Sequence, residues 1–122
     1  MRDFRTLLVW QKASHLTDLT YDLIAQLPQT EQFDLVAQMR RASQSIEMNI
    51  AEGCGRKGSV DFARFLHMAM GSASELECAI GICTRRGFGQ ESHRLQATRQ
   101  VVEVKKMLAS LIRKLIPNRY RR

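Results

Sequence analysis

The chain has 122 residues, of which 44% are hydrophobic and 25% are charged, and its formal net charge is +7. This length and composition are typical of one globular domain. They argue against a disordered chain, because apolar residues recur throughout at regular spacing. No apolar run approaches the ~20 residues that cross a bilayer, so we expect no membrane partner.

The first predicted helix covers residues 6–26, where apolar side chains recur in steps of three and four, the spacing of one buried helix face. Leu8, Leu19 and Tyr21 fall outside that stripe. This helix is therefore expected to have a second apolar side that contacts another subunit. Pro28 ends the helix, because the residue before a proline avoids helical geometry.

The second predicted helix covers residues 31–52, with Thr30 as the expected N-cap. It is expected to stop at Gly53-Cys54-Gly55, where glycine can take the left-handed C-cap conformation. The loop Gly53–Gly58 formally matches the dinucleotide-binding pattern G-x-G-x-x-G. That turn requires a strand before it, and the sequence predicts no strand. The loop is therefore expected to connect two helices without binding a nucleotide.

The third predicted helix covers residues 59–86, with Ser59 as its expected N-cap. Its apolar residues alternate in steps of four and three, which predicts a heptad-like seam. The seam consists of Phe62, Leu66, Ala69, Ala73, Leu76, Ile80 and Cys83. Gly71 and Gly81 each cost about 1 kcal/mol relative to Ala inside a helix, so we expect close packing against a neighbouring helix there.

The fourth predicted helix covers residues 91–116 and is stopped by Pro117. Its apolar stripe consists of Val101, Val104, Leu108, Leu111 and Leu115. Arg99, Lys106 and Arg113 lie seven residues apart, so they share one face that points away from this stripe. A basic tail follows at residues 117–122.

Four helices of these lengths with short connections predict an all-α fold, an antiparallel up-down-up-down four-helix bundle forming a single domain over residues 1–122. A di-iron site in such a bundle needs Glu-x-x-His pairs, and the sequence contains none. Cys78 and Cys83 lie five residues apart, which is not a zinc-ligand spacing. No G-x-S-x-G turn is present either. We therefore expect no enzyme activity, no catalytic residue, no metal and no cofactor.

The excess positive charge is concentrated near the C-terminus. Between Arg99 and Arg122 the sequence has eight basic residues and one acid, Glu103. The basic residues are Arg99, Lys105, Lys106, Arg113, Lys114, Arg119, Arg121 and Arg122. They form either a surface for phosphates and acidic partners or a face that only promotes solubility. Cysteines are three in number and suggest no disulfide framework, so the expected location is the cytoplasm.

Several segments together resemble a known family. They are Phe4–Lys12, Gln38–Ala42, Ser45-Ile46, Asn49–Gly53 and Gly71–Glu77. They resemble the bacterial four-helix-bundle family called 23S rRNA intervening-sequence proteins, a label that describes where some family genes lie. That family is similar to the accessory variability protein of diversity-generating retroelements, which assists a reverse transcriptase and binds nucleic acid.

The resemblance implies a ring-shaped homopentamer with a basic surface and no catalytic residues. It also assigns a packing or assembly role to a set of motif positions. These are Arg41, Ser45, Asn49, Glu52, Gly53, Gly71, Ser72 and Glu75. From its position, Glu75 is also a candidate ion-pair partner of Arg41. The sequence leaves open whether Asn49 and Glu52 face a partner or the bundle interior.

Charge and resemblance together predict a non-enzymatic oligomeric accessory protein associated with nucleic acid. Its expected partners are further copies of itself and RNA or DNA, or a reverse transcriptase. The alternative is a protein-interaction scaffold that binds no nucleic acid, in which the motif serves subunit packing and the charge has no specific role.

Overall fold

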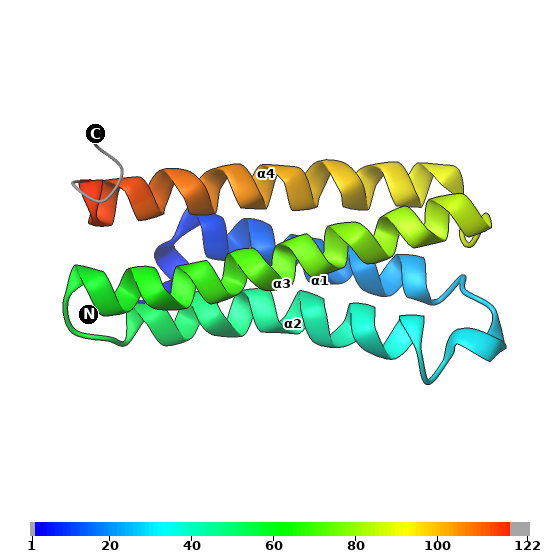
Figure 1. Ribbon diagram of the computed structural model, residues 1–122, viewed down its shortest axis with the longest axis horizontal. Coiled ribbons are helices and arrows are strands. Elements are labelled where there is room, and N and C mark those ends of the chain that lie inside the picture. The colour runs from blue at the N-terminus through cyan, green and yellow to red at the C-terminus, as the bar shows by residue number, and fades with distance from the viewer. Residues whose placement is uncertain (1, 118–122) are drawn as a thin grey trace.

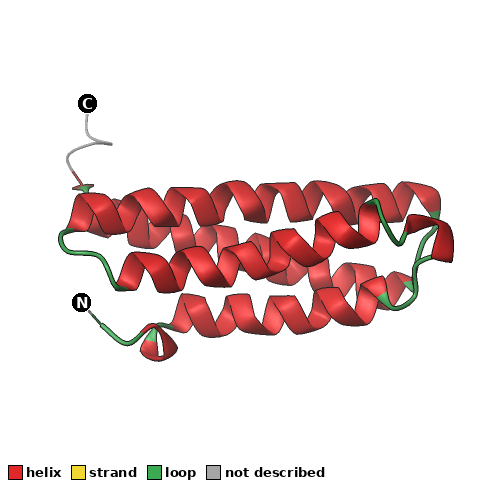
Figure 2. Ribbon diagram, turned by 90° about the horizontal axis from the view of Figure 1, so that it is seen from below, coloured by secondary structure: helices red, strands yellow, loops and turns green. Residues whose placement is uncertain are grey.

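Four long helices lie side by side in the computed structural model, which describes residues 2–117 (Figure 1). They are α1 (Leu8–Ile24), α2 (Leu35–Cys54), α3 (Ser59–Arg86) and α4 (Glu91–Leu115), with short 3-10 helices η1 (Phe4–Thr6) and η2 (Gln29–Glu31). Within the described residues there is no strand (Figure 2). Both α1 and α3 pack against α2 and α4, so the helices form a closed square in chain order. The predicted all-α antiparallel four-helix bundle is confirmed.

The core runs the length of the bundle and follows the helical periodicity of the sequence. Every residue of the seam predicted in α3 is buried. On α4, Val101, Val104 and Leu108 are fully buried, whereas Leu111 and Leu115 lie at the core's edge. Two polar residues lie inside the core, and both hydroxyls donate to their own helix: Thr20 Oγ1 to Leu16 O at 2.7 Å, and Ser43 Oγ to Arg40 O at 3.0 Å. Among residues 2–117, no charged side chain is buried in the core.

The start of α2 differs from the prediction. The α-helix begins at Leu35 rather than Glu31, and Thr30 lies inside the 3-10 helix η2 instead of capping α2. Pro28 begins this turn in extended geometry, and its carbonyl accepts the Glu31 N–H at 2.9 Å. The segment crosses the end of the bundle before Leu35 enters the core, so the α-helix cannot begin earlier.

The end of α2 also differs, because Gly53 lies within the helix and is not its cap. A Cβ at Gly53 would lie 2.8 Å from Phe62 Cδ1 and 3.1 Å from Phe65 Cβ, so glycine here allows α3 to approach α2. The helix ends at Cys54 with right-handed backbone at Gly55. The loop that matched the nucleotide pattern thus joins two helices, as expected.

The bounds of α3 coincide with the prediction, and α4 ends one residue before it. Ser59 is the first helical residue, however, and Gly58 at φ +81° precedes it as the N-cap. At the other end of α3, Gly87 takes the left-handed conformation, φ +71°, while Phe88 N–H donates to Cys83 O at 2.9 Å. This arrangement is a Schellman-type helix end.

The first helix is shorter than predicted. It covers Leu8–Ile24 because the residues before it form η1, whose N-cap Asp3 accepts the Arg5 N–H at 3.0 Å. Trp10 packs edge-on against Phe4 with ring centroids 4.8 Å apart. Leu8 is 58% exposed, in agreement with the predicted second apolar side of this helix.

One half of the bundle holds the start of α1, the end of α2, the start of α3 and the end of α4. Arg2 N–H donates to Cys54 O at 3.3 Å, which fixes the N-terminal segment against α2. We call this half the terminal half (left in Figure 1). Among the described residues, no helix is both long enough and apolar enough to span a membrane.

Candidate interaction surfaces

The motif residues of α2 line an open groove on the surface. We call it the α2–α3 groove. It has a volume of about 660 Å³ and lies in the terminal half. Its lining consists of Arg41, Gln44, Ser45, Met48, Asn49, Glu52, Arg56 and Phe65. The α2 members recur in steps of one helical turn, on a face next to the buried stripe Met39, Ala42, Ile46 and Ile50.

Small polar groups tie the two helices together at the groove. Ser72 Oγ on α3 donates to Ser45 Oγ at 2.9 Å, and Asn49 Nδ2 donates to the same oxygen at 3.0 Å. Asn49 Nδ2 also donates to Ser45 O at 2.9 Å, so its amide is held along its own helix. Asn49 therefore lies at the groove wall, half-buried, and not in the core.

The charged members of the groove form a surface pair. Glu52 is exposed and bonded to Arg56 Nη2 at 2.8 Å, four residues further on and just past the end of α2. The Arg56 guanidinium also lies 4.7 Å from the centre of the Phe65 ring. Exposed pairs of this kind contribute less than about 1 kcal/mol, so they shape the surface more than they stabilise the fold.

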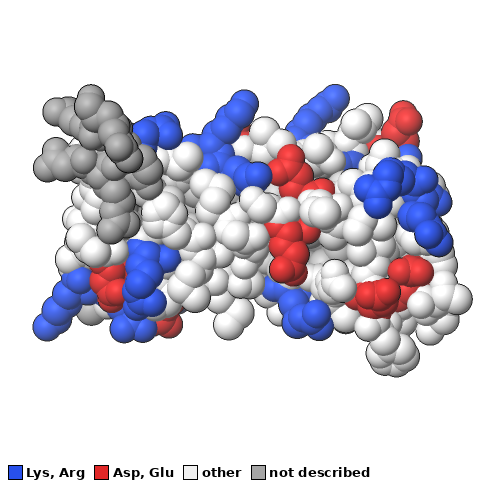
Figure 3. Space-filling view, viewed as in Figure 1, with Lys and Arg blue, Asp and Glu red and all other residues white. Residues whose placement is uncertain are grey.

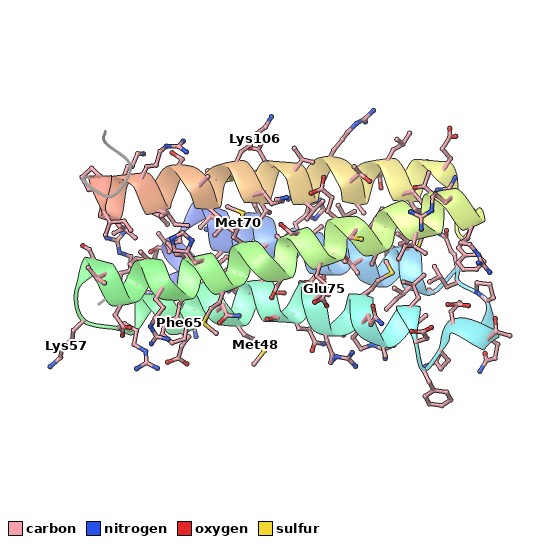
Figure 4. The ribbon with its side chains drawn as sticks, in the orientation of Figure 1. Met48, Lys57, Phe65, Met70, Glu75 and Lys106 are labelled. Atoms are coloured by element: carbon pink, nitrogen blue, oxygen red, sulfur yellow. The ribbon has the colours of Figure 1, made fainter. Side chains whose placement is uncertain are left out.

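Apolar atoms form the groove's floor and rim. Phe65 is buried beneath it at 8% exposure, while Met48 is 68% exposed and Met68, one turn from Phe65 on α3, is 48% exposed. Figure 4 shows Met48 projecting from the α2 edge of the bundle, with Phe65 to its left where α2 and α3 lie next to each other. Of these two methionines, Met48 lines the groove. An exposed methionine beside an apolar floor is typical of adaptable protein-binding surfaces.

Three motif positions, Arg41, Glu75 and Gly71, do not make the contacts expected of them within one chain. Arg41 and Glu75 are both exposed, and within residues 2–117 no ion pair joins them. Gly71 is exposed as well, whereas Gly81 is half-buried, and a Cβ at either position would meet nothing within 4 Å. The expected close helix approach at Gly71 and Gly81 is therefore absent, and Gly53 is the position that needs it.

A second apolar patch lies across the bundle on the α1–α4 seam, also in the terminal half. It encloses about 260 Å³ and is lined by Leu7, Leu8, Val9, Met107, Ser110, Leu111 and Lys114. Because the helices form a square in chain order, this seam is opposite the α2–α3 groove. We call it the α1–α4 patch.

The predicted cationic face of α4 is exposed. Arg99, Lys106 and Arg113, which we call the α4 ridge, all face solvent. Among the described residues, none of the three forms an ion pair. Lys and Arg side chains stand out along the α4 edge (Figure 3), and Lys106 projects away from the side that bears Met48 (Figure 4).

The other predicted basic residues do not belong to the α4 ridge. Lys105 Nζ is bonded to Glu77 Oε1 at 2.9 Å, so that charge is neutralised between α3 and α4. Lys114 is exposed beside the α1–α4 patch. Arg119, Arg121 and Arg122 lie outside the described residues. Four groove residues were not among the predicted motif positions: Gln44, Met48, Arg56 and Phe65. Met48 and Arg56 nevertheless continue the one-turn spacing of the motif.

The described residues offer little that resembles reaction chemistry. Within residues 2–117, no group of three His, Cys, Asp or Glu side chains is placed to hold a metal ion. Burial raises the pKa of the Cys54 and Cys83 thiols above 9.0, which disfavours the reactive thiolate. Cys78 is exposed on α3.

Comparisons with known proteins agree with this architecture. No curated protein matches the chain. The structure is similar to the crystal structure of a protein of unknown function from the S23 ribosomal protein family of Bacteroides thetaiotaomicron VPI-5482, with a TM-score of 0.79 and 24% sequence identity. The match covers 86% of this chain and 98% of that chain, and at this identity it shows a common fold. Residues 5–110 match the family described as 23S rRNA-intervening sequence protein, and because this match spans most of the sequence, the chain belongs to that family.

Proposed function

We propose that this protein is a non-enzymatic accessory protein that works as a homo-oligomer in the cytoplasm and binds nucleic-acid phosphates through the α4 ridge. Its partner is RNA or DNA, or a reverse transcriptase that acts on them. The observation that carries the proposal is the row of three exposed cations that form no ion pair among residues 2–117. Positive charge without a local partner attracts polyanions at long range.

We assign self-assembly to the α2–α3 groove and the α1–α4 patch. The α1–α4 patch is largely apolar, and the α2–α3 groove has the apolar Met48 and Phe65 among polar walls; they lie on opposite seams and mainly in the terminal half. Two different patches allow the groove of one copy to receive the patch of the next, and such head-to-tail contacts form a ring when the rotation between copies closes. The family resemblance favours five subunits. Each subunit would then contribute one α4 ridge, and repetition would strengthen weak phosphate contacts.

Charge reversal on α4 tests nucleic-acid binding. The wild-type protein should shift a labelled structured RNA or a DNA duplex at low salt, measured by fluorescence anisotropy. Lys106→Glu combined with Arg113→Glu should weaken binding at least tenfold, on the order of 1 kcal/mol or more for each lost phosphate contact. Both residues are exposed, so circular dichroism should be unchanged. Absence of wild-type binding at low salt would overturn this part of the proposal.

Light scattering tests assembly. The wild-type protein should have the mass of an oligomer, and Met48→Asp should dissociate it by placing a charge in the groove. Phe33→Asp is the matched control, because Phe33 is 96% exposed and follows η2 at the opposite end of the bundle. Its oligomer should remain intact. A monomeric wild-type protein, or equal dissociation of both variants, would contradict the assignment.

The second candidate is a protein-interaction scaffold, and the exposed Met48 of the groove favours it. In that case the oligomer forms and Met48→Asp dissociates it, but the protein binds no nucleic acid. The two measurements above therefore separate the two functions.

A further inference from the structure

The α4 ridge has a geometry that favours one form of nucleic acid. Its three residues are seven positions apart on an uninterrupted helix, so their Cα atoms are about 10.5 Å apart at 1.5 Å per residue. The row is about 21 Å long and drifts only about 20° around the helix per step. It is therefore nearly straight, and the helix backbone holds its spacing.

A duplex presents a dense array of phosphates along a stiff axis. Each strand carries one phosphate per ~3.4 Å of axis, so the ridge is as long as about six base pairs, and because the strands wind around the axis it meets phosphates of both strands. The two strands together carry one charge per ~1.7 Å. A single strand has a lower charge density and must give up conformational freedom to lie along a straight row.

The helix lacks what single-strand binding requires. Proteins that bind single strands stack the bases on aromatic side chains, worth ~1–3 kcal/mol per base. The sequence of α4, from Glu91 to Leu115, contains no Phe, Tyr or Trp. The exposed side chains of the ridge therefore offer charge without a stacking surface.

The number of contacts is limited by the neighbouring charges. Lys105, next to Lys106, is bonded to Glu77 at 2.9 Å and is not available to a phosphate. Glu103 is exposed on the ridge side of α4 between Arg99 and Lys106, and its negative charge would repel a phosphate. This leaves one phosphate contact for each ridge residue.

We infer that the α4 ridge binds double-stranded nucleic acid along its phosphate backbone, with three phosphates contacted per subunit, and that it discriminates against single strands. The inference rests on the proposed function and specifies its substrate class. Duplex RNA and duplex DNA share this chemistry.

The test compares three labelled probes by fluorescence anisotropy on the full-length protein. They are a DNA duplex of about 20 base pairs, the RNA duplex of the same sequence, and one of the strands alone, chosen to lack self-pairing; this length exceeds the ridge several-fold. At least one duplex should bind tenfold or more tightly than the strand. A strand that binds equally well or better would overturn this inference and leave the proposed function standing. If no probe binds at low salt, both fail.

Salt dependence tests the contact number. The slope of log K against log salt should be about −2.7 for each subunit on a duplex, at ~0.9 per phosphate contact. Each of Arg99→Gln, Lys106→Gln and Arg113→Gln should reduce its steepness by ~0.9 per subunit. Lys105→Gln removes the same charge one position away and should leave the slope unchanged. Equal effects of Lys105→Gln and Lys106→Gln would show that overall charge, and not the ridge, drives binding.

Discussion

At the scale of single residues, Gly53 is a position where added volume is poorly tolerated. A Cβ there would lie 2.8 Å from Phe62 Cδ1, well inside ordinary contact distance. We expect Gly53→Ala to lower the free energy of unfolding by about 1–3 kcal/mol, because the clash outweighs the better helix propensity of Ala. Urea denaturation followed by circular dichroism measures the change.

Gly71→Ala is the matched control. A Cβ there meets nothing within 4 Å, so the same substitution should stabilise the protein by up to about 1 kcal/mol. If Gly53→Ala were stabilising as well, the Phe62 ring would have room to move, and the close approach of α3 to α2 would not depend on glycine.

The three cysteines differ in accessibility, which predicts their reactivity. Cys54 and Cys83 are buried, and burial raises the pKa of both thiols above 9.0, whereas Cys78 is exposed. Iodoacetamide near neutral pH should therefore add one label to the folded protein and three after unfolding, measured by intact mass. Folded Cys78→Ser should take up none. A labelled Cys78→Ser protein would indicate local opening of the core.

The same pKa shifts give the pH dependence a sign. Above pH 9.0 the thiols of the unfolded chain lose their protons before the buried ones do, so the unfolded state binds fewer protons. Stability should therefore decline as pH rises through this range, and should be unaffected by these thiols below it. Urea denaturation midpoints across the alkaline range test this sign.

At the scale of elements, Gln26 links the end of α1 to the start of α4. Its Oε1 accepts the Gln90 N–H at 2.7 Å, and its Nε2 lies 2.8 Å from His93 Nδ1. We expect Gln26→Ala to cost about 1–2 kcal/mol of unfolding free energy, because two hydrogen bonds between elements are lost. Gln96→Ala, an exposed position on α4, is the control and should change stability by less than about 0.5 kcal/mol. Equal effects would mean that the link is not stabilising.

The helices themselves were predictable, because each buries one stripe at helical spacing, and the seam of α3 is the clearest example. The start of α2 was not. Thr30 and Glu31 have the chemistry of a helix start, but the chain must first cross the bundle end before Leu35 is buried. Gly53 has the chemistry of a cap, but its role is set by Phe62, which is contributed by another helix.

The surfaces were predictable only in part, for the same reason. The exposure of Arg99, Lys106 and Arg113 follows from their seven-residue spacing. The neutralisation of Lys105 depends on the register of α4 against α3, which a single sequence does not specify. The α2–α3 groove likewise combines residues from two helices, so its apolar floor, Phe65, could not be assigned to the motif.

At the scale of the whole molecule, the proposed assembly predicts a dependence on concentration. If copies associate through the α2–α3 groove and the α1–α4 patch, the oligomer is favoured by mass action, and the melting temperature should rise with protein concentration. Met48→Asp should remove this dependence without lowering the melting temperature of the monomer, since Met48 is largely exposed. A melting temperature of the wild-type protein that is the same over a hundredfold range of concentration would contradict the assembly.

The contact between Trp10 and Phe4 has a practical consequence. Trp10 is the one tryptophan of the sequence, and its ring packs edge-on against Phe4 in η1. Its fluorescence therefore reports on the junction between η1 and α1, whereas far-ultraviolet circular dichroism averages over all four helices. If the terminal half opens before the rest, the two signals will change at different denaturant concentrations. A single spectroscopic probe built into the sequence can thus show whether the half that carries both proposed assembly surfaces unfolds on its own.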